Sequence, residues 1–162
     1  MSLYRNSLRI LLVDTYPLQS RIQFKKNSIT MASKLYKNCI NRVLQKKYPN
    51  TQVLYNTIYP TEMDSKDINK IDSYNGSLWT GSSLNIDDSE KHHTINNQMK
   101  LIEHMFVKGI PSFGSCWALQ LLSTMQGGIC KEMDKPREFG FARKIELTEI
   151  GILTGCCLSV SV

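Results

Sequence analysis

The sequence GIPSFGSCWALQLLSTMQGG, residues 109–128, is the most informative segment for the fold. Residues 110–113 form a short apolar run typical of a buried strand, and residues 117–126 have the composition of a helix that is closed by a Gly-Gly pair. A short Gly-Ser-Cys segment separates the two patterns. We therefore expect a strand that turns directly into a helix, with Cys116 in the turn.

This arrangement is typical of a nucleophile elbow, a sharp turn that exposes a nucleophile and needs small residues two positions before and after it. Gly114 and Ala118 meet that requirement. The N-terminus of the following helix would stabilise a negatively charged thiolate and favour its attack on a carbonyl carbon. The alternative is a buried structural cysteine, but the flanking strand and helix patterns favour the elbow.

The region before this segment predicts a strand, a helix and a second strand. Residues 9–14 are an apolar run that ends in a polar residue, which suits a parallel strand buried on both faces. The carboxyl end of this strand should point toward a site. Residues 30–47 predict an amphipathic helix and residues 51–55 a strand. The apolar face of the helix is expected to contain Met31, Leu35, Cys39, Val43 and Leu44.

The middle of the chain predicts a third strand and a long helix. Residues 77–80 read as a strand that runs into a glycine-containing turn. A helix follows, because Ile95, Met99, Ile102 and Phe106 recur at helical spacing. Asp87, Asp88 and Ser89 are suitable caps for its start, and Gly109 is a suitable stop. Residues 144–148 predict a further strand.

Alternating strands and helices predict an α/β fold with three layers, in which helices cover both faces of a mostly parallel, doubly wound sheet. Ligands of such sheets bind at the carboxyl ends of the strands. We expect one domain over residues 8–151 that is incomplete at its C-terminus. Residues 152–162 form an uncharged tail that breaks the pattern.

Composition narrows the class of protein. The chain has 162 residues, 41% of them hydrophobic, with no apolar run long enough for a signal peptide or membrane span, so we expect a cytosolic protein. The five cysteines show neither disulfide-scaffold nor zinc-site spacing, and no metal or other cofactor is expected. The net charge of +6 lies partly on the helix of residues 30–47, which we interpret as a solvated face rather than a nucleic-acid site.

Three motifs, in order and spacing, resemble those of class I glutamine amidotransferases, closest to stand-alone GMP synthase-like members. They are TGSS at residues 80–83, the segment of residues 109–128, and EFGFARKIELTEIG at residues 138–151. The resemblance implies a flavodoxin-like fold and hydrolysis of the glutamine side-chain amide through a cysteine thioester. It also implies that glutamate and ammonia are the products, and that a synthetase domain or subunit would receive the ammonia.

The resemblance assigns roles to particular residues. Cys116 would attack the amide carbon, and the backbone amide of Trp117 would hold the developing oxyanion together with one from Gly81 or Ser82. Gln120 lies one helical turn after the nucleophile, where the family's glutamine helps to bind substrate. The alternative for Gln120 is an ordinary exposed helix residue.

Two departures from the family pattern stand out. Ala118 occupies a position where many relatives have glycine. The family's catalytic histidine and its acidic partner follow the nucleophile, yet no histidine follows His104 in this sequence. We interpret His92, His93 and His104 as surface or packing residues. The chain is therefore predicted to be a truncated amidotransferase-like domain that is inactive alone.

Two alternative functions remain open. The first is a non-catalytic interaction module or pseudoenzyme that associates through an exposed sheet edge or the uncharged tail. The second is a peptidase or deglycase of the wider superfamily, against which the TGSS motif and Gln120 argue.

Overall fold

The protein is described by a computed structural model, in which the chain divides into two compact units, residues 1–131 and 132–162. The structure describes residues 7–63, 68, 70–86, 93–131, 146–147, 149 and 158–159. In the second unit, strands β5 (Glu146–Leu147) and β6 (Leu158–Ser159) pair antiparallel. Most of the motif of residues 138–151 and of the tail lies outside the described residues, as do the predicted caps Asp87, Asp88 and Ser89.

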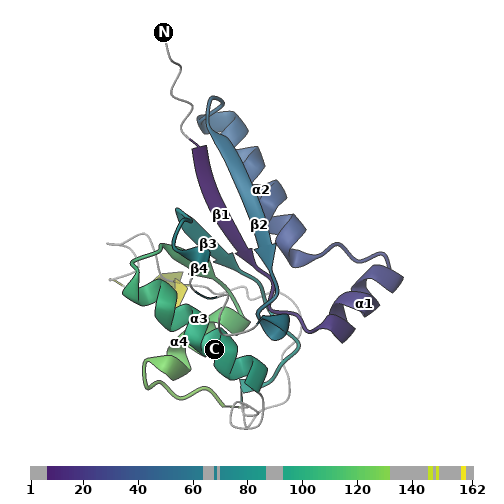
Figure 1. Ribbon diagram of the computed structural model, residues 1–162, viewed down its shortest axis with the longest axis vertical. Helices are drawn as coiled ribbons and strands as arrows, with labels where there is room; N and C mark the ends of the chain where they lie inside the picture. The colour runs from purple at the N-terminus through teal and green to yellow at the C-terminus, as the bar shows by residue number, and fades with distance from the viewer. Residues whose placement is uncertain are drawn as a thin grey trace. The chain divides into compact units, whose positions relative to one another are not determined.

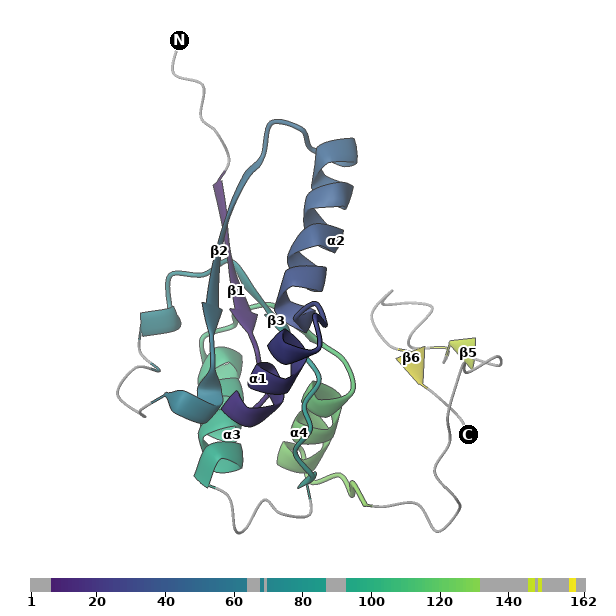
Figure 2. The same cartoon turned by 90° about the vertical axis from the view of Figure 1, so that its right-hand side faces the viewer.

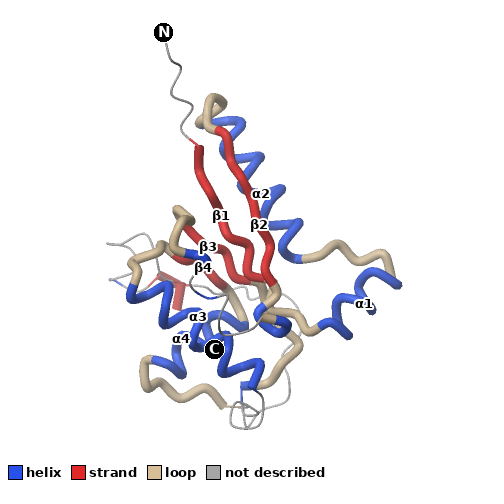
Figure 3. Tube along the Cα trace, in the orientation of Figure 1, coloured by secondary structure: helices blue, strands red, loops and turns tan. Residues whose placement is uncertain are grey.

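The first unit contains a four-stranded sheet in the order β2-β1-β3-β4, and every neighbouring pair is parallel (Figure 1). Its strands, red in Figure 3, are β1 (Ser7–Val13), β2 (Gln52–Ile58), β3 (Gly76–Trp79) and β4 (Ser112–Gly114). Parallel strands need crossover connections, and helical segments occupy the connections here. The predicted α/β fold with a parallel sheet is confirmed.

The helices of the first unit cover both faces of this sheet. They are α1 (Leu18–Lys26), α2 (Ala32–Lys47), α3 (His93–Val107), α4 (Trp117–Met125) and the short 3-10 helix η1 (Pro60–Glu62). Figure 2 shows α2 running along one side of the strands.

Two neighbouring residues of β4 show that α2 and α3 lie on opposite faces. Successive side chains of a strand point to opposite sides of the sheet. The ring of Phe113 meets that of Tyr36 on α2 edge-on, with centroids 6.5 Å apart. The hydroxyl of Ser112 lies 3.9 Å from the sulfur of Met105 on α3. The sheet is therefore sandwiched between helices, as the three-layer prediction requires.

The rotation of α2 differs from the prediction. Leu35 and Val43, expected on the buried face, are 55% and 49% exposed, whereas Ser33 is buried. Polar contacts explain the difference: the Ser33 hydroxyl donates to Asp14 at 2.8 Å, and the Tyr36 hydroxyl lies 2.9 Å from that of Ser115. Hydrogen bonds to the sheet and its loops thus set the helix rotation, and apolar periodicity does not.

Two further differences concern α1 and α3. Helix α1 was not predicted, and none of its residues is buried, so the apolar periodicity on which such predictions depend is missing there. The long helix α3 was predicted, but Phe106 is 68% exposed and Met105 is buried in its place. Helix α3 ends before Gly109, whose φ of 63° suits the predicted glycine stop.

The core of the first unit lies between the sheet and the helices. It contains Leu11, Val13, Ile71, Trp79, Ile86, Ile95, Leu101, Met105, Trp117, Ala118 and Leu121. Strand β1, with neighbours on both sides, supplies its centre, whereas β4 lies at the edge of the described sheet and its residues are exposed. Within the described residues, no helix combines the length and apolar character needed to span a membrane.

Candidate functional site

Cys116 lies in the turn that connects β4 to α4, as predicted. Its backbone has φ 56° and ψ −109°, a conformation that residues with a Cβ rarely adopt, and its side chain is exposed. Such a backbone costs about 1–3 kcal/mol and is kept only where the surrounding structure enforces it. The strained strand-to-helix turn with an exposed nucleophilic side chain is the geometry of a nucleophile elbow.

Close packing enforces this turn. A Cβ added at Gly114 would lie 2.4 Å from the Cβ of Ala118 and 3.1 Å from that of Trp79, so only glycine fits between β3 and α4. The single methyl group of Ala118 fills the space that Gly114 leaves open. The residues two positions before and after Cys116 must therefore be small because they contact each other directly.

The first residue of α4, Trp117, fixes where the helix begins. Its indole is buried, and the ring N–H donates a 2.7 Å hydrogen bond to the side-chain oxygen of Gln98 on α3. The backbone N–H of Trp117 belongs to the first turn of α4, where amide groups have no carbonyl partner within the helix. This N–H is therefore available next to the Cys116 thiol.

The turn after β3 (residues 80–83, the TGSS turn) lies beside the elbow. Strands β3 and β4 are parallel neighbours with Trp79 opposite Gly114, so their carboxyl ends meet. A Cβ added at Gly81 would lie 3.8 Å from the sulfur of Cys116. Gly81 and Cys116, predicted from separate motifs, are thus brought together.

Side-chain hydrogen bonds hold the TGSS turn from the side of β1. The backbone N–H of Thr15 donates to the Thr80 hydroxyl at 3.0 Å, and the Thr15 hydroxyl donates to the Gly81 carbonyl at 2.7 Å. The Ser82 hydroxyl donates to the Thr15 carbonyl at 2.9 Å. Thr15 and Thr80 are fully buried, so these bonds are shielded from water.

Tyr16 forms another wall of the site. Its hydroxyl lies 3.4 Å from the point where a Gly81 Cβ would be, and the Cys116 sulfur lies 3.8 Å from that same point. Burial raises the pKa of Tyr16, and Cys116, Asp14 and Tyr36 raise it further by charge repulsion. Tyr16 is therefore a neutral hydrogen-bond donor at neutral pH, and its phenol lies beside the thiol.

Gln120 lies on the first turn of α4, and its backbone N–H donates to the Cys116 carbonyl at 3.2 Å. Its side chain is partly buried and makes no hydrogen bond to the described residues. This placement leaves the predicted role in substrate binding untested.

The described histidines make no contact with the thiol. His104 pairs with Asp72 at 2.6 Å, and Lys108 reaches the other oxygen of the same carboxylate at 2.6 Å. Asp72 precedes β3 and Cys116 follows β4, so the ion pairs lie at the opposite ends of these parallel strands. His93 is exposed at the start of α3, and His92 lies outside the described residues.

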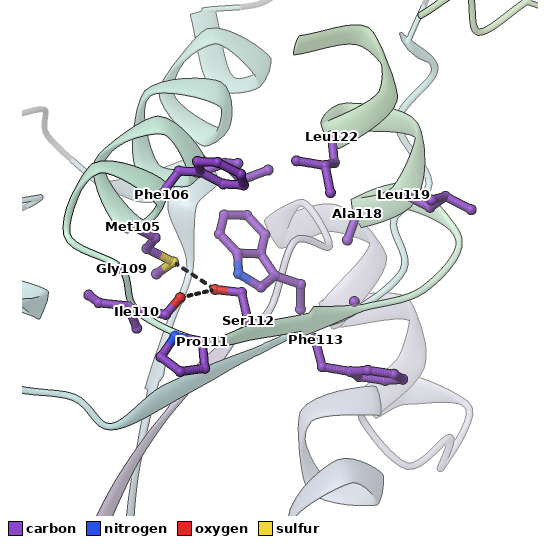
Figure 4. Close-up of a pocket in the computed structure, with 13 residues that line it drawn as sticks. Met105, Phe106, Gly109, Ile110, Pro111, Ser112, Phe113, Ala118, Leu119 and Leu122 are labelled. Carbon is purple, nitrogen blue, oxygen red and sulfur yellow. Dashed lines mark hydrogen bonds between the residues drawn. The ribbon is translucent and has the colours of Figure 1, made fainter. Parts of the chain in front are cut away.

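An apolar cavity of about 440 Å³ lies between α3 and α4. Figure 4 shows Phe106 and Leu122 on either side of it, with Ser112 below hydrogen-bonded to the Ile110 carbonyl. The cavity touches the elbow at Gly114 and Ala118, but Cys116 does not line it. Its lining is almost wholly apolar and offers no group for acid-base chemistry, so we place the candidate active site at the thiol instead.

Within the described residues, no group of three or more His, Cys, Asp or Glu side chains is arranged to hold a metal ion. The chemistry that the arrangement can perform is nucleophilic: an exposed thiol at a helix N-terminus, backbone amides beside it and a neutral phenol. Cys39 lies on α2 and Cys130 after α4, outside disulfides, but neither lies in such a turn.

Sequence reasoning found the nucleophile turn and the TGSS motif but missed Thr15, Tyr16 and Tyr36. A usable signal existed for two of them. Thr15 and Tyr16 follow directly after a strand whose carboxyl end was expected to point toward a site. Tyr36 was missed because the buried face of its helix, α2, was predicted wrongly.

Comparison with known proteins is consistent with hydrolytic chemistry. No protein-family model and no solved structure matches the chain. The chain is 30% identical over 147 residues to gamma-glutamyl-L-1-hydroxyisopropylamide hydrolase from a Pseudomonas species. The matched region covers 89% of this chain and 47% of that protein, so the chain spans about half the length of this relative. The chain is therefore a distant relative of a hydrolase that acts on a γ-glutamyl amide.

Proposed function

We propose that the chain carries the nucleophile part of a class I glutamine amidotransferase-like site, and that this site hydrolyses the amide bond of γ-glutamyl compounds. The observation that carries the proposal is the strained backbone of Cys116, which holds an exposed thiol at the start of α4 beside Gly81. The distant γ-glutamyl amide hydrolase supports the reaction class.

In the proposed reaction the Cys116 thiolate attacks the γ-carbonyl carbon of the substrate. The tetrahedral intermediate collapses with cleavage of the C–N bond, and the departing nitrogen takes up a proton and leaves as ammonia or an amine. Water then attacks the thioester, which releases glutamate and restores the thiol. Atoms balance with one water consumed for each amide hydrolysed.

The negative charge on the carbonyl oxygen needs hydrogen-bond donors. The backbone N–H of Trp117 and those of Gly81 and Ser82 are the proposed donors. Trp117 adjoins Cys116, the Cβ position of Gly81 is 3.8 Å from the sulfur, and Ser82 follows Gly81 in the same turn. Gln120 is proposed to bind the substrate from the first turn of α4. The neutral phenol of Tyr16 faces the same space.

A general base is also needed, and the described histidines do not supply one near Cys116. We propose that turnover requires a histidine and an acid from a partner, such as a synthetase subunit. Without them the thiol would be acylated once and deacylated slowly. Acylation of the thiol can therefore be measured separately from turnover.

The substrate class is proposed to be amides of the glutamate side chain, with either unsubstituted nitrogen, as in glutamine, or N-alkyl nitrogen. The name of the distant relative describes an N-alkyl amide, whereas the sequence motifs resemble enzymes that use glutamine itself. Amine release from glutamine and from γ-glutamylethylamide, compared in parallel, decides between the two.

The test uses γ-glutamyl p-nitroanilide, because release of its coloured amine reports acylation directly. The purified chain is expected to release about one equivalent of p-nitroaniline in a burst and to gain the mass of a γ-glutamyl group. Cys116→Ala should abolish both signals. Cys39→Ala, which removes another exposed thiol, is the matched control and should leave both unchanged. Folded protein that gives neither burst nor acyl adduct would contradict the proposal.

A second candidate function is non-catalytic association through β4. This strand lies at the edge of the described sheet, and Phe113, Phe106 and Leu119 around it are each more than half exposed. Sedimentation of the purified chain tests this function. A stable oligomer that Phe113→Ser dissociates, in protein whose Cys116 fails the acylation test, would favour association over hydrolysis.

A further inference from the structure

The Thr15 hydroxyl faces two successive carbonyl groups of the TGSS turn. It lies 2.7 Å from the Gly81 oxygen and 3.2 Å from the Thr80 oxygen. Both carbonyl groups therefore point toward β1, the strand that Thr15 follows. In a regular strand successive carbonyls would point in opposite directions, so the second one has been turned.

The direction of a carbonyl fixes the direction of the neighbouring amide. In a trans peptide unit the C=O and N–H bonds point in opposite directions, and the described chain contains no cis peptide. The Thr80 carbonyl shares its peptide unit with the N–H of Gly81, and the Gly81 carbonyl shares its unit with the N–H of Ser82. Both N–H groups must therefore point away from Thr15.

The strand order shows what lies on that other side. Strand β3 lies between β1 and β4, and Cys116 follows β4. Amides turned away from β1 are turned toward the elbow, and the Cβ position of Gly81 is 3.8 Å from the Cys116 sulfur. Two consecutive N–H groups that point the same way form a small anion-binding concavity.

We propose that Thr15 is a positioning residue, whose hydroxyl holds the Gly81 and Ser82 amides in the orientation that binds the oxyanion. The inference rests on the proposed function, because it concerns the negative charge created by attack of Cys116. Thr15 does not touch the substrate. It acts by holding the Gly81 carbonyl at 2.7 Å, the shorter of two hydroxyl contacts to that oxygen, since the Thr80 hydroxyl donates to it at 3.0 Å. The direction of this carbonyl sets the direction of the Ser82 amide.

Two reagents separate this role from general damage to the fold. The chloromethyl ketone analogue of glutamine alkylates a thiol through a tetrahedral oxyanion, whereas iodoacetamide alkylates it by direct displacement without one. Labelling rates at Cys116 are measured with both reagents by mass spectrometry. Thr15→Val keeps the shape and removes the hydroxyl, and Thr15→Ser keeps the hydroxyl. Ser77→Ala removes another buried hydroxyl, in the middle of β3, as a matched control.

Loss of a single oxyanion donor typically costs about a hundredfold or more, so we expect Thr15→Val to slow chloroketone labelling at least about tenfold. Iodoacetamide labelling should stay within about twofold. Thr15→Ser and Ser77→Ala should react like the wild type with both reagents. If Thr15→Val does not fold, Thr15→Ala removes the same hydroxyl without a bulky replacement and is measured in its place.

Failures of the inference and of the proposed function are distinguishable. Equal chloroketone rates for wild type and Thr15→Val, in a wild type that the chloroketone labels faster than iodoacetamide does, overturn the positioning role alone. Equal slowing with both reagents overturns it as well, because the hydroxyl then only stabilises the fold. A wild type that the chloroketone does not label preferentially overturns the proposed function and the inference together.

Discussion

The TGSS turn and the elbow are two short turns that follow adjacent parallel strands, yet different interactions set their backbones. The TGSS turn is held by hydroxyl groups. Thr15 donates to the Thr80 hydroxyl and to the Gly81 carbonyl, and the Ser83 and Ser20 hydroxyls are 2.6 Å apart. The elbow has an exposed nucleophile in a strained conformation and is held by contact between Gly114 and Ala118.

Each turn should therefore respond differently to substitution. Hydrogen bonds fix the direction of individual peptide groups, so removal of a hydroxyl should alter chemistry before it alters the fold. Steric contact fixes the path of the chain, so an added methyl group at the elbow should alter both.

Replacement of Cys116 should eliminate acylation completely. The stabilities of two replacements should differ because the backbone at this position is strained. Glycine adopts positive φ without penalty, so Cys116→Gly should be more stable than Cys116→Ala by about 1 kcal/mol. Urea unfolding of the two variants measures the difference. Equal stability would mean that the backbone at Cys116 is not strained in solution.

Gly114→Ala should disrupt the elbow, because the new Cβ would lie 2.4 Å from that of Ala118. Overpacking of this kind costs about 1–3 kcal/mol, and the shift should also slow acylation of Cys116. The matched control is Gly109→Ala, since a Cβ there meets nothing within 4 Å and only the positive φ is penalised. A Gly114→Ala protein with wild-type stability and reactivity would refute the steric account.

Gln98→Leu should lower the stability of the fold next to the elbow, because it removes the acceptor for the Trp117 indole N–H. A buried donor without a partner costs about 1–3 kcal/mol. The net loss should be smaller, since the Gln98 side-chain N–H₂ is itself buried without a described partner and Leu removes it. Thermal unfolding measures the loss, and Gln98→Glu, which retains an acceptor, serves for comparison.

Tyr16 should report the closeness of the thiol through its titration. Its pKa is raised by burial first and by Cys116 second, so Cys116→Ala should move it back toward 10, the usual value for tyrosine. The folded protein keeps a proton that the unfolded chain releases, so stability falls as the pH rises above about 10. Tyr16→Phe should reduce that fall. The comparison residue is Tyr55, whose pKa is raised by burial alone and should not respond to Cys116→Ala.

Asp72 should give the smallest effect, because it lies at the other end of the strands from both turns. Hydrogen bonds from Lys108 and His104 lower its pKa below 3.8. The carboxylate therefore stabilises the fold above that pH, and the contribution disappears as the pH falls through the lowered pKa. Asp72→Asn should remove this acid dependence in urea unfolding. Neither Asp72→Asn nor His104→Ala should change acylation of Cys116.

Much of the fold followed from the sequence because strand and helix patterns in this chain are strong. Residues 9–14 contain a compact apolar run and residues 77–80 read as a strand, and both ranges overlap strands of the parallel sheet. The elbow was predictable since small residues must flank such a turn. Helix α1 was missed because a helix with no buried residue has no apolar period to detect.

The site was predicted less completely than the fold, for a physical reason. Cys116, Gly81 and Trp117 belong to short motifs that can be recognised from the sequence alone. Thr15 and Tyr16 act through contacts with residues about 65 and 100 positions away, and hydroxyl groups of this kind are common in any sequence. Only the strand order brings β1 and the TGSS turn together.

The proposed role of Cys116 is tested most directly by identifying which thiol reacts with the chloromethyl ketone analogue of glutamine. Peptide mapping after labelling should place the adduct on Cys116, with Cys39 and Cys130 unmodified, and excess glutamine should protect Cys116 from the reagent. Equal labelling of Cys39, or labelling of Cys116 that glutamine does not slow, would contradict the claim that this elbow binds and attacks a γ-glutamyl group.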